Sequence, residues 1–503
     1  MEENLYGILR AGFADRLDEA FLCPPGQAAR SYRELDELSA RYAGLLGELG
    51  LQAGDRAVAQ VEKSPEAVAF YLACLRTGVI YVPLNTAYTP AELEQFLGDA
   101  QPRLFVATPA AAAVLEPAAQ QAGVSHLLSL DDQGEGSLAQ RALSVAARET
   151  LEPRTASDIA AIVYTSGTTG RSKGAMLSIE NLASNARTLY RLWGWQADDV
   201  LLHALPVFHV HGLFVALHCA LLGGHRVLFH TRFDAGSVRA ALAEATVMMG
   251  VPTFYTRLLD EPGFGAADCA HMRLFISGSA PLLGASMEAF AQLTGQRILE
   301  RYGMTEAGMI TSNPLEGERI AGSVGYPLPG VTVRVRNDAG QDCPADTVGQ
   351  VEIRGPNVFA GYWRQPEKTR AEFTSDGFFR TGDLGSLSAD QRLTLVGRSR
   401  DLIISGGYNI YPKEIESALD AMDSVAESAV IGVPHADLGE GVVAIIVATG
   451  KPPEEAALQA TLTGRLAKFK HPRRYVILDS LPRNAMGKVE KQRLRERYAD
   501  LLS

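Results

Sequence analysis

The sequence predicts an α/β protein with a large N-terminal domain of α/β sheets plus a small β region, followed by a small α+β C-terminal domain. Short apolar runs rich in β-branched residues alternate with helical patterns over residues 30–150 and again from Val200, as in βα units. Around Gly322–Gly361 the pattern changes to short strands separated by turn residues. It changes once more at Gly397, so we expect domains at residues 1–397 and 398–503.

Hydrophobic periodicity and flanking turn residues predict the individual elements. Expected helices of the large domain are Tyr32–Leu49, Ser64–Thr77 and Thr89–Ala100. Its expected strands are Arg56–Gln60, Ile80–Pro83, Arg103–Ala107, Arg226–Phe229, Val247–Gly250, Met272–Ser277, Arg297–Glu300, Val331–Arg336 and Gly349–Arg354. The most apolar stretch, Gly212–Gly224, is too short to span a membrane and predicts a core helix. In the C-terminal domain we expect helix Pro412–Ala421, strands Glu427–Val433 and Val442–Ala448, and a further helix–strand pair.

Composition limits the partners and the compartment. Lys and Arg total 47 and Asp and Glu total 58, so the net charge is −11, which argues against nucleic acid as a partner. The N-terminus begins Met-Glu-Glu-Asn and lacks the basic and apolar order of a secretory signal. The five cysteines are scattered without a C-x-x-C pair, which favours free thiols in a reducing compartment. We therefore expect a cytoplasmic protein without a membrane partner.

The stretch Tyr164–Gly174 has the composition of a phosphate-binding loop. It follows an expected strand, Asp158–Val163, and precedes a segment, Met176–Leu192, that we expect to be helical. Glycines let backbone amides approach an anion, hydroxyls donate to its oxygens, and a lysine adds a full charge. The spacing differs from G-x-x-x-x-G-K-[ST] of the common nucleoside triphosphatases, and the alternative is a mobile polar loop. The candidate phosphate-binding residues are Thr165, Ser166, Gly167, Thr168, Thr169, Gly170 and Lys173.

Four further motifs accompany this loop: Ser277–Pro281, Arg301–Glu306, Phe379–Asp383 with Arg398, and Pro482–Val489. Each alone has an ordinary explanation, such as a turn or a solvated lysine. Together they resemble the signatures of the adenylate-forming superfamily, which comprises acyl-CoA synthetases, aryl-CoA ligases, luciferases and adenylation domains. The resemblance covers nearly the whole chain.

The resemblance implies how ATP is bound. The glycine-rich loop would wrap the β- and γ-phosphates, Tyr302 would stack on adenine and Thr305 would contact the α-phosphate. Glu306 would hold Mg²⁺, which suits carboxylate and phosphate oxygens, with Thr165 as a second metal contact. Asp383 can accept both ribose hydroxyls. The remaining expected ATP contacts are Arg398, Ser279, Ala280 and Glu300.

The same resemblance implies a reaction in two halves. A carboxylate attacks the α-phosphate of ATP to give an acyl-adenylate and pyrophosphate, and the thiol of coenzyme A then displaces AMP. Lys488 would bridge the carboxylate and the α-phosphate, so the expected catalytic residues are Lys488, Glu306 and Thr305. Between the halves the small domain would swing about a hinge at Arg400. The coenzyme A arm would then pass Ser405, Gly406, Gly407 and Tyr408.

The acid is predicted from a departure from the superfamily pattern. Most members have a small residue before the Tyr-Gly of the adenine motif, whereas this chain has Arg301. A buried guanidinium needs an anion, which a second substrate carboxylate would supply; the alternative is that Arg301 pairs with Glu300 or Glu306. The surrounding sequence is similar to the malonyl-CoA and methylmalonyl-CoA synthetases. We therefore expect a small dicarboxylic acid, with substrate contacts from Arg301, His209, Ser277, Val207 and Met304.

Other functions stay open on the sequence alone. A short- or medium-chain monocarboxylate–CoA ligase would make Arg301 structural. A free-standing amino-acid adenylation enzyme would need an early pocket aspartate, which the Phe208-His209 region lacks. A luciferase-like oxygenase is permitted by the framework but required by no residue. Because the matching lysine is a target of regulatory acylation in some members, a lysine acyltransferase or deacylase acting on Lys488 is a further possible partner.

Overall fold

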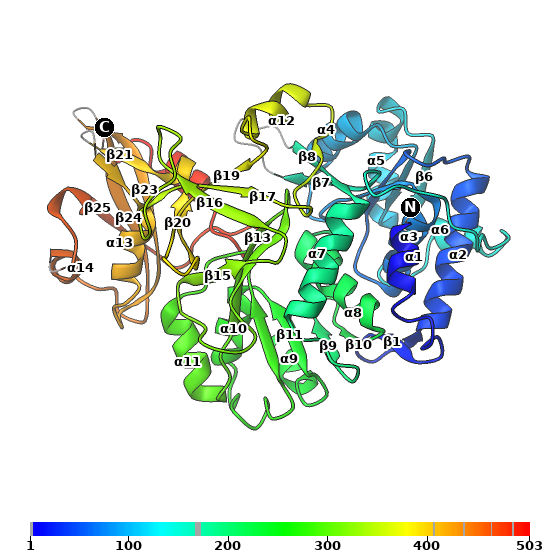
Figure 1. The fold of residues 1–503 in the computed structure, drawn as a ribbon, viewed down its shortest axis with the longest axis horizontal. Coiled ribbons are helices and arrows are strands. Elements are labelled where there is room, and N and C mark those ends of the chain that lie inside the picture. The colour runs from blue at the N-terminus through cyan, green and yellow to red at the C-terminus, as the bar shows by residue number, and fades with distance from the viewer. Residues whose placement is uncertain are drawn as a thin grey trace.

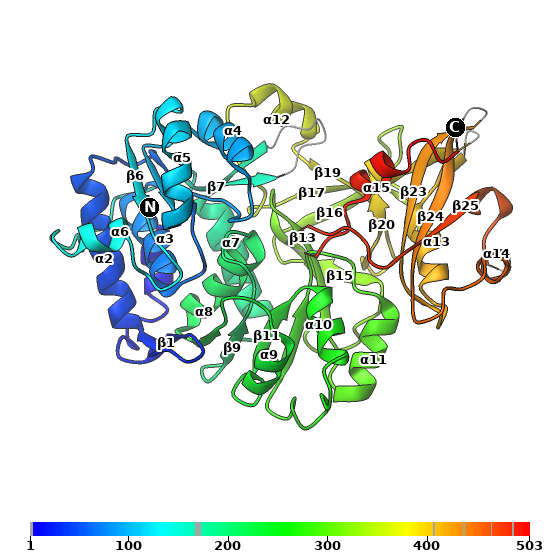
Figure 2. The same cartoon turned by 180° about the vertical axis from the view of Figure 1, so that it is seen from behind.

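The computed structural model describes residues 4–165, 173–405, 408–435, 438–463, 465–484 and 487–502. Within these residues the chain forms three sheets covered by helices. Figure 1 and Figure 2 show two sheets and their helices in one large body, with the third sheet in a smaller C-terminal part on one side. The predicted α/β fold with a large N-terminal and a small C-terminal domain is confirmed.

The first sheet carries the strand that leads into the glycine-rich loop. Its strand order is β18 (Gly361–Tyr362), β8 (Lys173–Ser178), β7 (Ile159–Thr165), β4 (Ile80–Pro83), β3 (Arg56–Gln60), β5 (Leu104–Ala107) and β6 (His126–Ser129). The pairs from β7 to β6 are parallel, and β8 and β18 add antiparallel strands at one edge. The helices between its strands are α3 (Pro65–Thr77), α4 (Pro90–Ala100), α5 (Pro109–Gln121) and α6 (Ser137–Ala142).

The second sheet is mixed and longer. Its strand order is β16 (Thr332–Arg336), β17 (Gly349–Arg354), β19 (Phe379–Leu387), β20 (Leu393–Arg398), β15 (Ser323–Pro327), β14 (Gly308–Ser312), β13 (Leu299–Met304), β12 (Leu274–Ser277), β11 (Val247–Gly250), β9 (Val200–His203), β10 (Arg226–Phe229), β1 (Ala20–Cys23) and β2 (Arg30–Ser31). The strands from β13 to β1 are parallel, and those from β13 to β16 are antiparallel. The antiparallel part is the small β region that the sequence predicts.

Helices fill the space around these sheets. They are α1 (Leu5–Arg10), α2 (Tyr32–Glu48), α7 (Ile179–Leu192), the π-helix η1 (His211–Leu217), α8 (His218–Gly223), α9 (Ala235–Ala241), α10 (Pro252–Leu259), α11 (Gly284–Thr294) and α12 (Pro366–Glu372). Every residue of α3 is buried, and so are all seven residues of η1. The predicted core helix at Gly212–Gly224 is therefore confirmed as η1 followed by α8. Within the described part of the chain, no helix is long and apolar enough to cross a membrane.

The C-terminal domain has its own sheet and its own core. The elements from residue 399 are η2 (Ser399–Asp401), β21 (Ile403–Ser405), β22 (Tyr408–Ile410), α13 (Pro412–Leu419), β23 (Val425–His435), β24 (Gly439–Ala448), α14 (Glu455–Thr463), η3 (Lys468–Lys470), β25 (Arg474–Leu478) and α15 (Lys491–Arg497). Strand β24 pairs antiparallel with β21 and β23 and parallel with β25. The predicted domain boundary falls at the end of β20, just before η2.

Two local predictions are wrong. The residues after the glycine-rich loop form strand β8, which pairs antiparallel with β7, and helix α7 begins only at Ile179. The loop thus leads from one strand to another, because Lys173–Ser178 pairs with β7 on one side and with β18 on the other. The strand predicted at Arg297–Glu300 runs instead from Leu299 to Met304 and contains most of the Arg301–Glu306 motif.

Candidate active site

The predicted ribose-binding residues lie together at the junction of β13, β19 and β20. Asp383 of β19 pairs in register with Arg398 of β20, and the Arg398 Nε lies 2.7 Å from Asp383 Oδ1. The Tyr302 hydroxyl donates to the other carboxylate oxygen, Asp383 Oδ2. Tyr302 belongs to the Arg301–Glu306 motif, whereas Asp383 and Arg398 belong to the motif Phe379–Asp383 with Arg398. The structure therefore brings the predicted adenine and ribose residues into one hydrogen-bonded cluster.

The predicted metal-binding carboxylate lies next to a tyrosine that the sequence analysis missed. Tyr362 of β18 donates its hydroxyl to Glu306 Oε1 at 3.0 Å, and the Lys173 Nζ lies 5.0 Å from the centre of the Tyr362 ring. Burial raises the pKa of Glu306, and the charges of Arg398 and Lys173 act in the opposite direction. Tyr362 lies in a two-residue strand without a local motif, so only its pairing with β8 reveals it.

The donor set at Glu306 fits Mg²⁺ held jointly with phosphate. Thr305 follows β13 in the tight turn to β14, and the Thr165 Oγ1 donates to the Lys173 carbonyl at 3.5 Å. Among the described residues there is no group of three or more His, Cys, Asp or Glu side chains placed to hold a metal ion. A magnesium ion at Glu306 would therefore complete its shell with phosphate oxygens and water, which is usual for this ion.

Lys488 of the C-terminal domain faces Tyr302, Asp383 and Arg398 of the large domain, which we call the nucleotide cluster. Burial, and then the charge of Arg398, lower the pKa of Lys488 to about 8, while Asp383 acts in the opposite direction. The Lys488 backbone amide donates to Asn484 Oδ1 at 3.0 Å. Gly487 has a φ of +72°, and a Cβ there would lie 3.0 Å from the Thr253 Oγ1 of α10. Thr253 thus makes a close interdomain contact that no sequence motif indicates.

The guanidinium of Arg301 lies buried on the second sheet, over the backbone of Gly278. A Cβ at Gly278 would lie 2.4 Å from the Arg301 Cζ, so only glycine leaves room for this side chain. Arg301 is 3% exposed, and its Nε and Nη2 have no hydrogen-bond partner among the described residues. Burial lowers its pKa to about 9. An unpaired buried guanidinium is costly, because its donors have lost water without gaining an acceptor.

Among the described residues no ion pair joins Arg301 to Glu300 or Glu306, although the Glu300 charge opposes the lowering of the Arg301 pKa. Glu300 accepts the Leu282 amide at 3.1 Å with Oε1, and its buried Oε2 has no hydrogen-bond partner in the described part of the chain. Successive strand residues point to opposite faces, which separates Glu300 from Arg301. Glu306 instead accepts from Tyr362. Burial raises the pKa of Glu300 to about 7. The contact of Glu300 with ATP stays a prediction.

Two histidines lie near Arg301. Burial, and then the Arg301 charge, lower the pKa of His209 to about 4 and that of His211 well below its usual value. Both imidazoles are therefore neutral at physiological pH and keep one N–H donor each. The His211 Nδ1 lies 3.2 Å from the Ser279 Oγ, whereas its Nε2 is buried and unpartnered. Ser279 has a φ of +71°, which is uncommon for a residue with a side chain.

The positions of the other predicted acyl-pocket residues do not identify a role for them. Val207 is buried and Met304 is half-buried. Ser277 pairs in register with Glu300, and its buried Oγ has no partner among the described residues. Ala280 lies beside Ser279 in the loop after β12. These assignments stay predictions.

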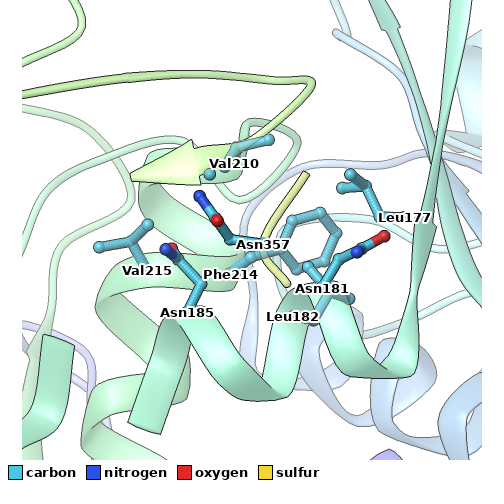
Figure 3. A pocket seen from close by; sticks show the side chains of 9 residues that line it. Leu177, Asn181, Leu182, Asn185, Val210, Phe214, Val215 and Asn357 are labelled. Carbon is cyan, nitrogen blue, oxygen red and sulfur yellow. The ribbon is translucent and has the colours of Figure 1, made fainter. Parts of the chain in front are cut away.

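A small pocket lies among α7, η1 and the start of β14. Figure 3 shows Val210, Phe214 and Val215 around it together with Asn357 and with Asn181 and Asn185 of α7. The Asn185 Nδ2 and Asn357 Nδ2 both donate to the Met309 carbonyl, at 2.8 and 2.9 Å. None of the predicted site residues is among the described residues that line the pocket. The two asparagines hold the start of β14 in place.

The residues predicted to contact coenzyme A or form the hinge lie on the C-terminal domain. Ser405 is buried, whereas Tyr408 is 57% exposed and stacks on Phe469 with ring centres 4.6 Å apart. Arg400 is exposed within η2, and the neighbouring Asp401 pairs with Arg495 at 2.6 Å. Gly406 and Gly407 lie outside the described residues. So do Ser166, Gly167, Thr168, Thr169 and Gly170 of the glycine-rich loop.

Comparisons with known proteins identify the two domains. Residues 14–363 match the family model described as AMP-binding enzyme, and residues 414–488 match that of the AMP-binding enzyme C-terminal domain. The chain is 37% identical to a malonate–CoA ligase of Arabidopsis thaliana, over 86% of this chain and 76% of that protein. It is 36% identical to the mitochondrial malonate–CoA ligase ACSF3 of Mus musculus, over 92% of this chain and 86% of that protein.

A solved structure is more similar still. The chain is 49% identical to MatB from Rhodopseudomonas palustris, with full coverage of both chains. It superposes on the ATP-bound structure of that protein with a TM-score of 0.97 and on the apo structure with a TM-score of 0.86. The structure is therefore more similar to the ATP-bound form of that protein than to its apo form.

Proposed function

The chain belongs to the AMP-binding enzyme family, and we propose that within it the protein is an ATP-dependent malonate–CoA ligase. The acid is activated as malonyl-adenylate with release of pyrophosphate, and coenzyme A then displaces AMP. The malonate–CoA ligases among its relatives support this assignment. The acceptance of 2-methylmalonate is part of the proposal. Val207 and Met304 would set how much room there is for its α-methyl group.

One observation carries the choice of acid: the unpartnered, buried guanidinium of Arg301. Its Nε and Nη2 both lack an acceptor among the described residues, and these two donors can bind the two oxygens of one carboxylate. A monocarboxylate has only the carboxylate that reacts at the α-phosphate, and it would leave the guanidinium unpaired. A malonate dianion supplies the missing partner with its second carboxylate. Neutral His209 and His211 add N–H donors without adding a charge.

The same arrangement gives each remaining residue a task in the first half-reaction. Thr305 and Lys488 would lie on the α-phosphate, and the Lys488 ammonium would draw together the attacking carboxylate and the phosphate. Glu306 would hold Mg²⁺, which neutralises phosphate charge when bound. Asp383 and Arg398 would fix the ribose. Activation of a carboxylate in this way depends on positioning and on charge neutralisation more than on acid–base chemistry.

The experiment is AMP formation with ATP, Mg²⁺ and coenzyme A across acetate, butyrate, benzoate, malonate, methylmalonate and succinate. We expect a clear preference for malonate. In Arg301→Met the loss of a buried charge pair should lower kcat/KM for malonate by about 30- to 1,000-fold, which corresponds to about 2–4 kcal/mol. The KM for ATP should be unchanged.

A control is Arg319→Met, which removes a half-buried arginine whose guanidinium donates to the backbone carbonyls of Pro314 and Leu315. It should lower stability without changing the preference among acids. Equal malonate kinetics in Arg301→Met and in the unchanged protein would contradict the proposal that Arg301 binds the second carboxylate of malonate. A preference of the unchanged protein for acetate or butyrate would contradict the choice of acid and keep the ligase.

A further inference from the structure

Two lysines share one carboxylate oxygen beside the predicted phosphate site. The Lys173 Nζ lies 3.6 Å from Glu372 Oε1, and the Lys368 Nζ lies 3.8 Å from the same oxygen. The Lys173 side chain is 9% exposed, and those of Lys368 and Glu372 are each 30% exposed. Burial, and then Lys368, lower the pKa of Lys173. The three groups together carry one excess positive charge in a partly buried place.

Helix α12 holds Lys368 and Glu372 over the sheet edge from which the glycine-rich loop emerges. Figure 1 and Figure 2 show α12 above β7 and β8 in both views. The helix is fixed to β18 by Thr369, whose Oγ1 accepts the Tyr362 amide at 2.9 Å and donates to the Gln365 carbonyl at 2.9 Å. Strand β18 in turn pairs with β8, which begins at Lys173. The hydrogen bonds of Thr369 therefore fix the position of the helical turn that carries Lys368.

A single aromatic ring separates this lysine pair from the predicted metal carboxylate. The Lys173 Nζ lies 5.0 Å from the centre of the Tyr362 ring, and the Tyr362 hydroxyl donates to Glu306 at 3.0 Å. A triphosphate with its α-phosphate at Thr305 and its metal at Glu306 would extend its far end toward the lysines. No sequence motif marks Lys368 or Glu372 for this position.

The ion pairs at Glu372 are loose. Both separations exceed the roughly 2.7–2.9 Å of a charge-assisted hydrogen bond. We propose that Lys368 and Lys173 together bind the terminal phosphate of ATP, and the pyrophosphate released by the first half-reaction, with Glu372 as the counter-ion that they exchange for it. A terminal phosphate has three acceptor oxygens and more charge than one carboxylate, so it satisfies both ammonium groups. This inference rests on the proposed ATP-dependent function.

Binding measurements test the proposal without the acid or coenzyme A. Titration calorimetry with Mg²⁺ would compare ATP, AMP and inorganic pyrophosphate as ligands. Lys368→Gln should weaken ATP and pyrophosphate roughly tenfold, the effect of losing one charge-assisted contact, and leave AMP unchanged. Glu372→Gln should strengthen ATP and pyrophosphate, because it removes the competing anion. Arg370→Gln, an exposed charge on the same helix, is the control and should bind all three ligands as before.

The result that overturns the proposal is an equal loss of ATP and AMP binding in Lys368→Gln, or no loss of either. Weaker ATP binding in Glu372→Gln would overturn the counter-ion role. Thermal melting of each variant shows that it is folded, and the partly exposed side chains make this the expected outcome. Because no acid is present, a wrong choice of acid would change the AMP-formation assay and leave these affinities unaffected.

Discussion

From the close approach of Gly487 to Thr253 we predict that one substitution will slow adenylation and leave thioester formation unchanged. Gly487 precedes the proposed catalytic lysine, and a Cβ at its position would lie 3.0 Å from the Thr253 Oγ1 and 3.4 Å from its Cγ2. The C-terminal domain therefore approaches α10 without space to spare when Lys488 faces the nucleotide cluster. The variant Thr253→Trp fills this contact with an indole. Since Thr253 is only half-buried in the large domain, the side chain can be accommodated when the small domain is elsewhere.

The size of the effect follows from the cost of overpacking. Forcing extra atoms into a packed contact costs about 1–3 kcal/mol, which corresponds to roughly 5- to 150-fold in an equilibrium constant. This cost falls only on the arrangement in which Gly487 lies on α10. Adenylation should slow by that factor, because the role that we propose for Lys488 at the α-phosphate requires this arrangement. Thioester formation, which we propose to occur after the small domain has swung, should be unaffected.

The two halves can be measured separately. Pyrophosphate release with malonate and ATP, without coenzyme A, reports adenylation, and AMP release from chemically prepared malonyl-adenylate with coenzyme A reports thioester formation. Val114→Trp is the control, because Val114 is 65% exposed on α5 in the large domain. An equal slowing of both halves in Thr253→Trp, or an unchanged adenylation rate, would refute the docking argument.

Two further predictions concern buried lysines. The pKa of Lys488 is lowered to about 8, so its ammonium is lost as pH rises through 8. The rate of pyrophosphate release should therefore decline above that pH. The rate of thioester formation from prepared adenylate should show no such decline. Lys63 is buried and donates to His203 Nδ1 at 2.7 Å, the His203 carbonyl at 2.9 Å and the His230 carbonyl at 2.6 Å. Lys63→Met should lower the free energy of unfolding by about 2–3 kcal/mol in urea denaturation, because these acceptors lose their donor. It should also raise the KM for malonate and not for ATP, since His203 holds the Gly212 carbonyl at 2.9 Å beside His211; equal changes in both KM values would contradict this link.

Much of the fold was predictable because its signals are local. Strands Arg56–Gln60, Ile80–Pro83, Arg226–Phe229 and Val247–Gly250 are observed with the predicted bounds, since each is a short apolar run enclosed by turns. The error after the glycine-rich loop has the opposite cause. Lys173–Ser178 is a strand because β7 and β18 pair on its two sides, and residue 361 is remote in sequence from residue 173.

The site divides in the same way. Tyr302, Asp383 and Arg398 belong to recognisable motifs, and the structure brings them into contact. Tyr362, Thr253 and Lys368 belong to none, and their positions become visible only when distant strands and helices pack together. Arg301 is an intermediate case. The sequence shows an unusual charge, but only the structure shows that its Nε and Nη2 have no hydrogen-bond partner within the part of the chain that it describes.

The charge distribution explains how an acidic protein can bind two anionic substrates at one place. The chain has a net charge of −11, yet the site collects Arg301, Arg398, Lys488 and Lys173 around two carboxylates, Glu306 and Asp383. The carboxylate of Asp383 is held by Tyr302 and Arg398, and Glu306 is the proposed metal ligand, so neither opposes the incoming phosphates with a free charge. The nearby histidines are neutral.

Local positive charge in a poorly hydrated site acts over a short range, and the overall negative charge is screened by salt beyond about 8–10 Å. Attraction for ATP and for the proposed substrate malonate is therefore set by these few cations. The removal of any one of them should raise the KM of the substrate that it faces more than that of the other.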